Sequence, residues 1–307
     1  MTGLPEGAAL RPGLETVHFD CDTLVFDVDG VLVDVRESFR EVIRATAAGV
    51  QRLMAVSVPW TPARDDITLF KRAGGFNDDI EMSIAMTAIG AGGRGGDVAR
   101  LAQAVEDAGG GLRALRAVAP ELPRIDGQVV LRFFSELYYG TTVYQRLYGH
   151  PVVHTDSERG LMERERALVA RDLPDRVRAQ GVRHLGVITG RSPQELEIAL
   201  ERLGWPATAL NAVVTGDMVR KPDPTCLDTV VAACHARALV YVGDVRDDWE
   251  LVRRYRDERD TGAEVRCILV GEDIETAVYR RLGVDATVRR TEDVLTLLRA
   301  WRAATGG

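Results

Sequence analysis

The chain has 307 residues, of which 46% are hydrophobic and 28% are charged, and its formal net charge is −7. This length suits one large domain or two moderate ones. The acidic balance gives no reason to expect a nucleic-acid partner. Because no apolar run approaches the length of a membrane span, no membrane partner is expected either.

The N-terminal residues and the cysteines give little functional signal. Residues 1–13 lack the apolar core of a signal peptide and are expected to form a disordered tail. The cysteines show no metal-ligand pairing such as C-x-x-C; they are Cys21, Cys226, Cys234 and Cys267. Reduced thiols of this kind indicate a cytoplasmic protein.

Lysine is nearly absent from the chain. Of the 39 basic residues, only Lys71 and Lys221 are lysines, and the rest are arginines. The planar guanidinium of arginine cannot replace a compact ammonium at a tight point-charge site. Each lysine is therefore a candidate for a specific role, and the alternative is an accident of composition.

The segment 23–34, Thr-Leu-Val-Phe-Asp-Val-Asp-Gly-Val-Leu-Val-Asp, carries the strongest local signal. Its apolar run predicts a buried strand that ends in Asp27 and Asp29, and Gly30 then allows a tight turn. Ligands of open α/β sheets bind at the carboxyl ends of the strands. Two close carboxylates are costly unless a cation neutralises them or one holds a proton. The segment indicates a hard metal such as Mg²⁺, acid–base chemistry, or both; the alternative is a turn with two solvated aspartates.

The region from residue 36 to residue 164 shows helical periodicity and no convincing strand. The expected helices cover residues 37–54, 64–72, 78–90, 98–119 with a break at 109–111, and 128–148. The last helix is rich in aromatic side chains, which are expected to be core rather than a ligand site. The region is predicted to be a helical insertion.

Strand–helix alternation returns after residue 164. The expected strands cover residues 184–189, 212–215, 239–243, 265–270 and 286–288. Alternating units of this kind imply a parallel sheet wrapped by helices, which the strand at 23–29 joins. The predicted fold is α/β, with a Rossmann-like, doubly wound parallel-sheet catalytic core (residues 1–35 and 165–307) and an inserted α-helical domain (residues 36–164).

Each later strand of the predicted core ends in polar groups. Thr189 and Gly190, in the segment Val-Ile-Thr-Gly-Arg at 187–191, offer a hydroxyl and a backbone amide suited to phosphate oxygens. Lys221 offers one ammonium just before a helix whose start is set by proline. The strand at 239–243 is followed by three carboxylates, Asp244, Asp247 and Asp248. Each feature alone is common, and an aspartate here could simply cap a helix, but together and in this order they form a specific set.

With this set, the sequence resembles the haloacid dehalogenase (HAD) superfamily, and specifically its subfamily IA-like phosphatases, in which a helical (type C1) cap follows the first motif. The four motifs of the superfamily correspond to Asp27-Val28-Asp29-Gly30, Thr189, Lys221, and Gly243-Asp244 with Asp248. The resemblance covers the core at both ends of the chain.

The resemblance implies a role for each motif residue. Asp27 would attack phosphorus and become an aspartyl-phosphate, and Asp29 would protonate the leaving alkoxide and later deprotonate water. Thr189 and Gly190 would hold phosphoryl oxygens that Lys221 neutralises. Mg²⁺ would be bound by Asp27, the Asp29 carbonyl and Asp244, with Asp248 in support. The residues alone favour the same chemistry, because a carboxylate that approaches an anionic phosphoryl group needs compensating positive charge and the alkoxide needs an acid.

The predicted function is that of a Mg²⁺-dependent phosphomonoesterase that acts on a small phosphorylated metabolite. One alternative is a phosphomutase of the β-phosphoglucomutase type, which protects the aspartyl-phosphate from water. Another is a non-catalytic binding module, which is disfavoured because no motif residue is missing. A dehalogenase or phosphonate hydrolase is disfavoured because those branches lack the second aspartate.

Substrate contacts are expected from the inserted domain. The resemblance implies that a loop of the cap near this position contacts the substrate, which makes Lys71 and Asn77 the candidates, and the Gly74-Gly75 pair between them suits such a flexible loop. The alternative for Lys71 is a solvated position at a helix end, where the helix dipole favours a cation. The substrate and the oligomeric state are left open.

Overall fold

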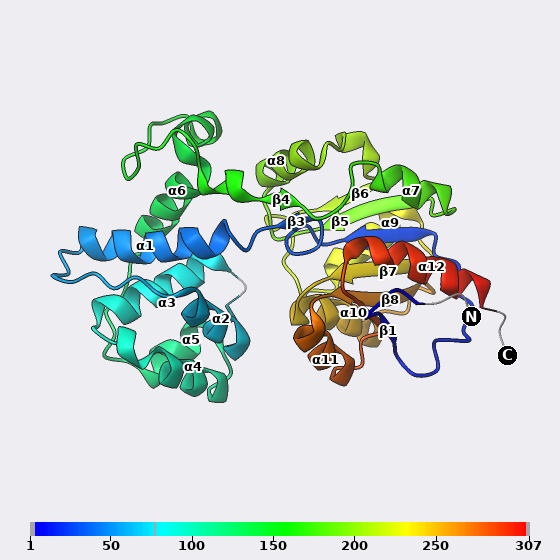
Figure 1. Ribbon diagram of the computed structural model, residues 1–307, viewed down its shortest axis with the longest axis horizontal. Coiled ribbons are helices and arrows are strands. Elements are labelled where there is room, and N and C mark those ends of the chain that lie inside the picture. Colours follow the sequence, from blue (N-terminus) through cyan, green and yellow to red (C-terminus); the bar gives the residue numbers. More distant parts are fainter. Residues whose placement is uncertain (1–3, 77, 305–307) are drawn as a thin grey trace. The chain divides into compact units, whose positions relative to one another are not determined.

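The computed structural model describes residues 4–76 and 78–304 (Figure 1). The chain splits into two compact units. Unit 1 is Met1–Asp34 with Arg166–Gly307, and unit 2 is Val35–Glu165. The predicted fold class, an α/β core with a helical insertion, is confirmed. That unit 2 covers an active site as a cap stays a prediction.

Unit 1 is built on a seven-stranded sheet with the strand order β1-β9-β8-β7-β2-β5-β6. All neighbouring strands are parallel except β1, which runs antiparallel to β9. The strands are β1 (Ala9–Leu10), β2 (Thr23–Phe26), β5 (His184–Ile188), β6 (Ala212–Val214), β7 (Ala238–Gly243), β8 (Glu264–Val270) and β9 (Ala286–Val288). A separate antiparallel pair, β3 (Val33–Asp34) and β4 (Arg166–Ala167), joins the two chain segments that lead to unit 2.

The position of β2 in the sheet determines where a site can form. Later parts of the chain supply both of its neighbours: Phe26 pairs with Val187 of β5 on one side and with Val242 of β7 on the other. The strand order therefore reverses at β2, and ligands of doubly wound sheets bind at such a switch point. All four residues of β2 are buried, as expected for an apolar strand covered on both faces.

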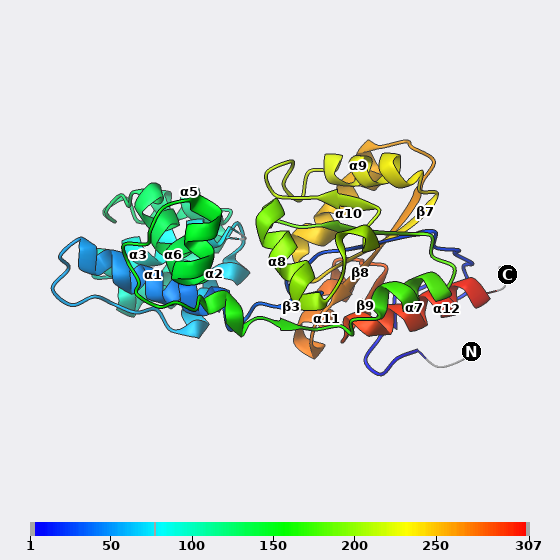
Figure 2. The same ribbon diagram turned by 90° about the horizontal axis from the view of Figure 1, so that it is seen from above.

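Helices cover both faces of this sheet (Figure 2). α9 (Thr225–Cys234) and α10 (Arg246–Glu258) lie on one face, and α7 (Leu173–Ala179) and α12 (Val294–Ala303) lie on the other. The buried cluster under α9 and α10 joins Val25 and Tyr241 of the sheet to Leu227 and Trp249 of the helices. The other helices of unit 1 are α8 (Pro193–Leu203), α11 (Asp273–Arg281), η3 (Ala207–Ala209) and η4 (Thr291–Asp293).

Unit 2 consists of helices in its described residues. They are α1 (Phe39–Leu53), α2 (Arg64–Ala73), α3 (Asp79–Ala91), η1 (Gly95–Asp97), α4 (Val98–Asp107), α5 (Gly111–Val118), α6 (Gly127–Tyr148) and η2 (Leu161–Arg164). α1 packs against α3 and α6. The aromatic side chains of α6 predicted to be core are buried, which confirms that prediction; they are Phe133, Phe134, Tyr138, Tyr139 and Tyr144.

The prediction of a disordered tail over residues 1–13 is wrong for its last part. Ala9 and Leu10 pair with β9 at the edge of the sheet. Arg11 extends this contact, because its backbone N–H donates to the Asp285 carbonyl and its guanidinium lies 3.1 Å from the Asp285 carboxylate. A two-residue strand is too short to produce a periodic pattern, so the sequence alone did not indicate it.

In the parts of the chain that the structure describes, no helix combines the length and the hydropathy that crossing a bilayer requires.

Candidate active site

The predicted motifs meet at the carboxyl edge of the unit 1 sheet. Asp27 directly follows β2, and its N–H donates to the Val242 carbonyl (2.8 Å). Thr189 follows β5 on one side, and Asp244 follows β7 on the other. Since the three strands are parallel and in register, these side chains belong to one edge of the sheet.

Lys221 is the cation at the centre of this edge. Its Nζ lies 2.7 Å from Asp27 Oδ2 and 2.8 Å from Asp248 Oδ1, and its side chain is only 13% exposed. Burial alone would lower the pKa of Lys221, but Asp248 and Asp27 outweigh that effect and raise it. The ammonium is therefore held charged between two carboxylates.

Asp248 organises its surroundings through hydrogen bonds. It is fully buried. Its Oδ1 accepts from Lys221 Nζ and from the Tyr241 hydroxyl (2.8 Å each), and its Oδ2 accepts from the backbone N–H groups of Asp244 (3.0 Å) and Val245 (3.1 Å). Because a carboxylate has about four acceptor positions, Asp248 is occupied in holding the ammonium and the turn after β7. Sequence reasoning missed Tyr241, which has the pattern of an ordinary buried strand residue.

The carboxylates form a group that suits a hard cation. Oxygen atoms of Asp27, Asp244 and Asp248 all lie within 4.8 Å of one another. Burial raises the pKa of Asp27 to about 7 although Lys221 opposes the shift. Burial, together with the charges of Asp248 and Asp27, raises the pKa of Asp244 well above its ordinary value. The group therefore lacks positive charge, and carboxylate oxygens are the ligands that Mg²⁺ prefers.

Gly30 makes the approach of Asp244 to β2 possible. A Cβ at this position would lie 1.9 Å from Asp244 Oδ2, and the residue has a φ of +74°. Both facts require glycine. The tight turn predicted after Asp29 thus also leaves space for a carboxylate from another strand.

Thr189 and Gly190 lie where a ligand oxygen could be bound. Thr189 is buried, and its Oγ1 accepts a hydrogen bond from the Arg191 N–H (3.2 Å), so its hydroxyl proton can still be donated to a ligand. Gly190 is exposed, and no atom of the described residues lies within 4 Å of the position that a Cβ would take.

Asp29 is paired with an arginine to which sequence reasoning gave no role. Its Oδ1 accepts hydrogen bonds from Arg191 Nε (2.8 Å) and Nη2 (2.6 Å). The Arg191 side chain is 3% exposed, and that of Asp29 is 28% exposed. The only sequence signal was the position of Arg191 directly after Thr189-Gly190.

The two residues predicted to contact substrate belong to unit 2. Lys71 lies in the last turn of α2, where its Nζ is 3.0 Å from Asp79 Oδ1 and its side chain is 39% exposed. Asn77 lies outside the described residues. A substrate contact by either residue stays a prediction.

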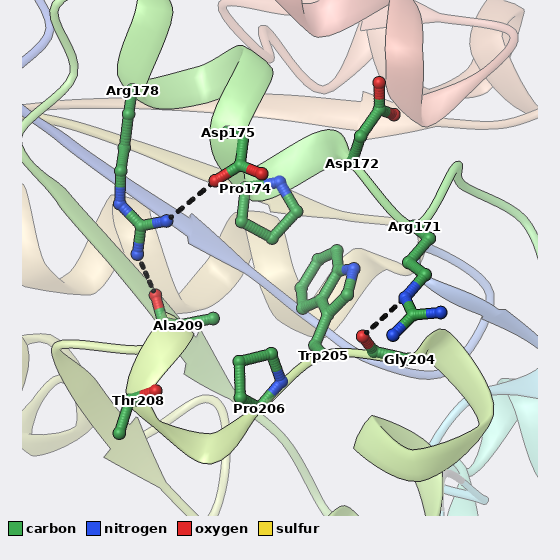
Figure 3. Close-up of a pocket in the computed structure, with 10 residues that line it drawn as sticks. All are labelled: Arg171, Asp172, Pro174, Asp175, Arg178, Gly204, Trp205, Pro206, Thr208 and Ala209. Carbon is green, nitrogen blue, oxygen red and sulfur yellow. Dashed lines mark hydrogen bonds and ion pairs between the residues drawn. The ribbon is translucent and has the colours of Figure 1, made fainter.

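One pocket of unit 1 contains none of the predicted site residues (Figure 3). This pocket has a volume of about 440 Å³ and lies between the loop before α7 and the segment after α8. Arg171 Nε donates to the Gly204 carbonyl (3.2 Å) and Arg178 Nη2 to the Ala209 carbonyl (2.9 Å) across it. These bonds connect the two segments, and the lining has no group of facing carboxylates.

Comparison with known proteins identifies relatives of this chain. The family described as haloacid dehalogenase-like hydrolase matches residues 21–250, more than half of the chain. No curated protein sequence matches.

Solved structures extend the similarity over almost the whole chain. Phosphatase Tt82 from Thermococcus thioreducens is 28% identical, with 90% of this chain and 99% of that chain covered and a TM-score of 0.67. CbbY from Rhodobacter sphaeroides, in complex with xylulose 1,5-bisphosphate, is 18% identical, with 88% and 95% covered and a TM-score of 0.51. The second similarity supports the fold alone.

The crowding of carboxylates predicts an unusual effect on stability. In a chelator, we expect Asp244→Asn to be more stable than the wild type by about 1 kcal/mol, because the amide removes a charge that burial and two neighbouring carboxylates disfavour. Thermal unfolding in EDTA measures the difference. The matched control is Asp228→Asn, which neutralises a carboxylate paired with Arg259 (2.9 Å) and should not stabilise. A lower melting temperature for Asp244→Asn than for this control would contradict the expectation.

Proposed function

This chain belongs to the haloacid dehalogenase-like hydrolases, and we propose that within this family it is a Mg²⁺-dependent phosphomonoesterase of a small phosphorylated metabolite. The observation that carries the proposal is the position of Asp27, a buried carboxylate at the end of the central strand with its Oδ2 2.7 Å from Lys221 Nζ. A nucleophile that must approach an anionic phosphoryl group needs such a cation beside it. The similarity to a phosphatase that is 28% identical is a second, independent support.

The chain's own residues can perform both halves of the reaction. Asp27 is oriented for attack, because its Oδ1 accepts the Val28 N–H (2.7 Å) while Lys221 holds Oδ2. When Asp27 bonds to phosphorus, the ester P–O bond breaks and Asp29 gives a proton to the leaving alkoxide. Asp29 then takes a proton from the water that hydrolyses the aspartyl-phosphate.

Binding of the phosphoryl group falls to the neighbouring strand ends. The Thr189 hydroxyl and the Gly190 N–H would donate to its oxygens, and Lys221 would balance their charge. Asp27, the Asp29 carbonyl and Asp244 would hold Mg²⁺, with Asp248 in support. When bound, the metal supplies the positive charge that the carboxylate group lacks.

The choice of substrate is assigned to unit 2 (Val35–Glu165), which we propose to be the cap. Phosphorylated sugars, phosphorylated amino alcohols and phosphoglycolate are the first compounds to test, with release of inorganic phosphate as the readout. Phosphate release also separates a phosphatase from a phosphomutase, which returns the phosphoryl group to a sugar.

A cytoplasmic location is proposed from the four cysteines, which are buried free thiols.

The nucleophile is tested by Asp27→Asn. We expect no release of phosphate from p-nitrophenyl phosphate and an intact fold, because an amide is no nucleophile but has almost the same shape. Phosphate release and circular dichroism are measured on the same samples. Asp175→Asn, which changes an exposed carboxylate near Arg178, is the control and should match the wild type. Near-wild-type turnover by Asp27→Asn would refute the mechanism.

The metal is tested by thermal unfolding, without reference to activity. A ligand that binds only the folded state stabilises it by about 2.7 kcal/mol at a hundredfold excess over Kd. Mg²⁺ should therefore raise the melting temperature of the wild type and of Asp228→Asn, and Asp244→Asn should lose most of this shift. An equal shift in all three proteins would place Mg²⁺ elsewhere on the chain.

The proposed substrate contact of Lys71 competes with a structural role in its ion pair with Asp79. If Lys71 contacts substrate, Lys71→Ala should lower kcat/KM for the best compound of the panel by roughly tenfold and leave p-nitrophenyl phosphate almost unaffected. Asp79→Asn breaks the same ion pair but keeps the ammonium, so it should cost much less. Equal losses in the two variants would assign Lys71 to the structure of unit 2.

A further inference from the structure

The pair between Arg191 and Asp29 has an unusual geometry. Two nitrogens of the guanidinium, Nε and Nη2, donate to the same oxygen, Asp29 Oδ1, at 2.8 Å and 2.6 Å. An arginine–carboxylate pair commonly uses both carboxylate oxygens in parallel. Here Oδ2 has no hydrogen-bond donor among the residues that the structure describes. One oxygen of Asp29 is therefore held while the other is left for a ligand.

The backbone around Arg191 is itself fixed on both sides. Its N–H donates to Thr189 Oγ1 (3.2 Å), and its carbonyl accepts from the Gly216 N–H (3.0 Å). Helix α8 begins directly afterwards with a capping box, in which the Ser192 N–H donates to the Glu195 carboxylate (2.8 Å) and the Glu195 N–H to Ser192 Oγ (3.3 Å). With its side chain 3% exposed, Arg191 is a rigid support and not a mobile surface arginine.

We propose that Arg191 is a positioning residue for proton transfer: it holds Asp29 by Oδ1 so that Oδ2 is the oxygen that exchanges protons. This inference rests on the proposed function, in which Asp29 is the acid and base. The proton leaves Oδ2 for the alkoxide as the P–O bond breaks, and Oδ2 later accepts one from the attacking water. Arg191 itself exchanges no proton. A proton carrier acts efficiently only within hydrogen-bond reach of its target, so a loosened carboxylate should transfer its proton more slowly.

The alternative is that the ion pair between Arg191 and Asp29 has only a structural role, in which it connects the segment after β2 with the segment after β5. A purely structural pair would lower stability when broken, and it would lower turnover of every substrate by the same factor. A positioning residue would instead affect most the substrates that need the proton. The dependence of rate on the leaving group therefore separates the two roles.

The experiment compares p-nitrophenyl phosphate with phenyl phosphate, which are similar in size. Phenoxide is the more basic leaving group and depends more on a proton from the enzyme. The ratio of their kcat/KM values is independent of the fraction of enzyme that is folded. For Arg191→Met, we expect the loss of kcat/KM to be about tenfold larger with phenyl phosphate than with p-nitrophenyl phosphate, and to lie mainly in kcat. A general acid contributes about 10²–10⁴ to the rate, and a loosened acid should lose a part of that factor. Arg176→Met, which removes the ion pair with Glu292 (3.0 Å), is the control and should leave the ratio unchanged.

A double-mutant cycle with Asp29→Asn tests whether Arg191 acts through Asp29. In the Asp29→Asn background, Arg191→Met should change the ratio by less than about twofold, because the two residues act as one unit. Arg191→Lys should restore the ratio only in part, since one ammonium cannot reproduce two donors in a fixed fork. If Arg191→Met does not fold, Arg191→Lys replaces it in the test. A wild-type ratio of the two kcat/KM values in Arg191→Lys would then overturn the inference.

The outcomes separate this inference from the proposed function. If Asp29→Asn itself leaves the ratio unchanged, the assignment of Asp29 as the acid fails. If Asp29→Asn changes the ratio and Arg191→Met does not, only the positioning role of Arg191 fails. An effect of Arg191→Met that persists in full without the Asp29 carboxylate would also overturn it.

Discussion

The site depends on one electrostatic constraint: two buried carboxylates and one half-buried carboxylate lie close together with a single ammonium between them. Asp27, Asp244 and Asp248 place oxygens within 4.8 Å of one another, and Lys221 lies between two of them. Burial strengthens repulsion among like charges, because less water screens it. The same arrangement suits a divalent cation, whose positive charge would relieve this repulsion. Repulsion among these carboxylates lowers the stability of the folded hydrolase, a cost that active sites commonly carry.

The architecture tolerates this crowding through backbone geometry. The strand order reverses at β2, so β5 and β7 bring their carboxyl ends to the same edge without a long loop. Close approach then needs residues without a side chain. A Cβ at Gly30 would lie 1.9 Å from the Asp244 carboxylate, and one at Gly243 would lie 2.3 Å from Asp248 Cβ. The two glycines of the motifs, one in the turn after Asp29 and one at the end of β7, thus set how near the carboxylates can come.

Sequence reasoning placed the strands of the sheet correctly where an apolar run ended in a polar residue. The strands before Asp27 and Asp244 are buried apolar runs, and a parallel sheet must bring their ends together. It failed where the pattern was too short, as in β1 (Ala9–Leu10), or where the side-chain direction decided the contact. Arg191 and Asp29 lie 162 residues apart in the chain, and Thr-Gly-Arg does not show where the guanidinium points. Tyr241 was missed for the same reason, because the sequence does not show that its hydroxyl donates a hydrogen bond to Asp248.

The cations of the site follow from the same geometry, and they explain why the chain uses lysine and arginine differently. Lys221 reaches Asp27 and Asp248 with a single nitrogen, at 2.7 Å and 2.8 Å, a geometry that suits a compact ammonium. Arg191 does the opposite and directs two nitrogens of a planar fork to one oxygen of Asp29. Exchange of either cation for the other type would keep the charge and lose the geometry. In a chain with only two lysines, Lys221 lies between two carboxylates at a point-charge site that suits an ammonium, which gives its presence there a physical reason.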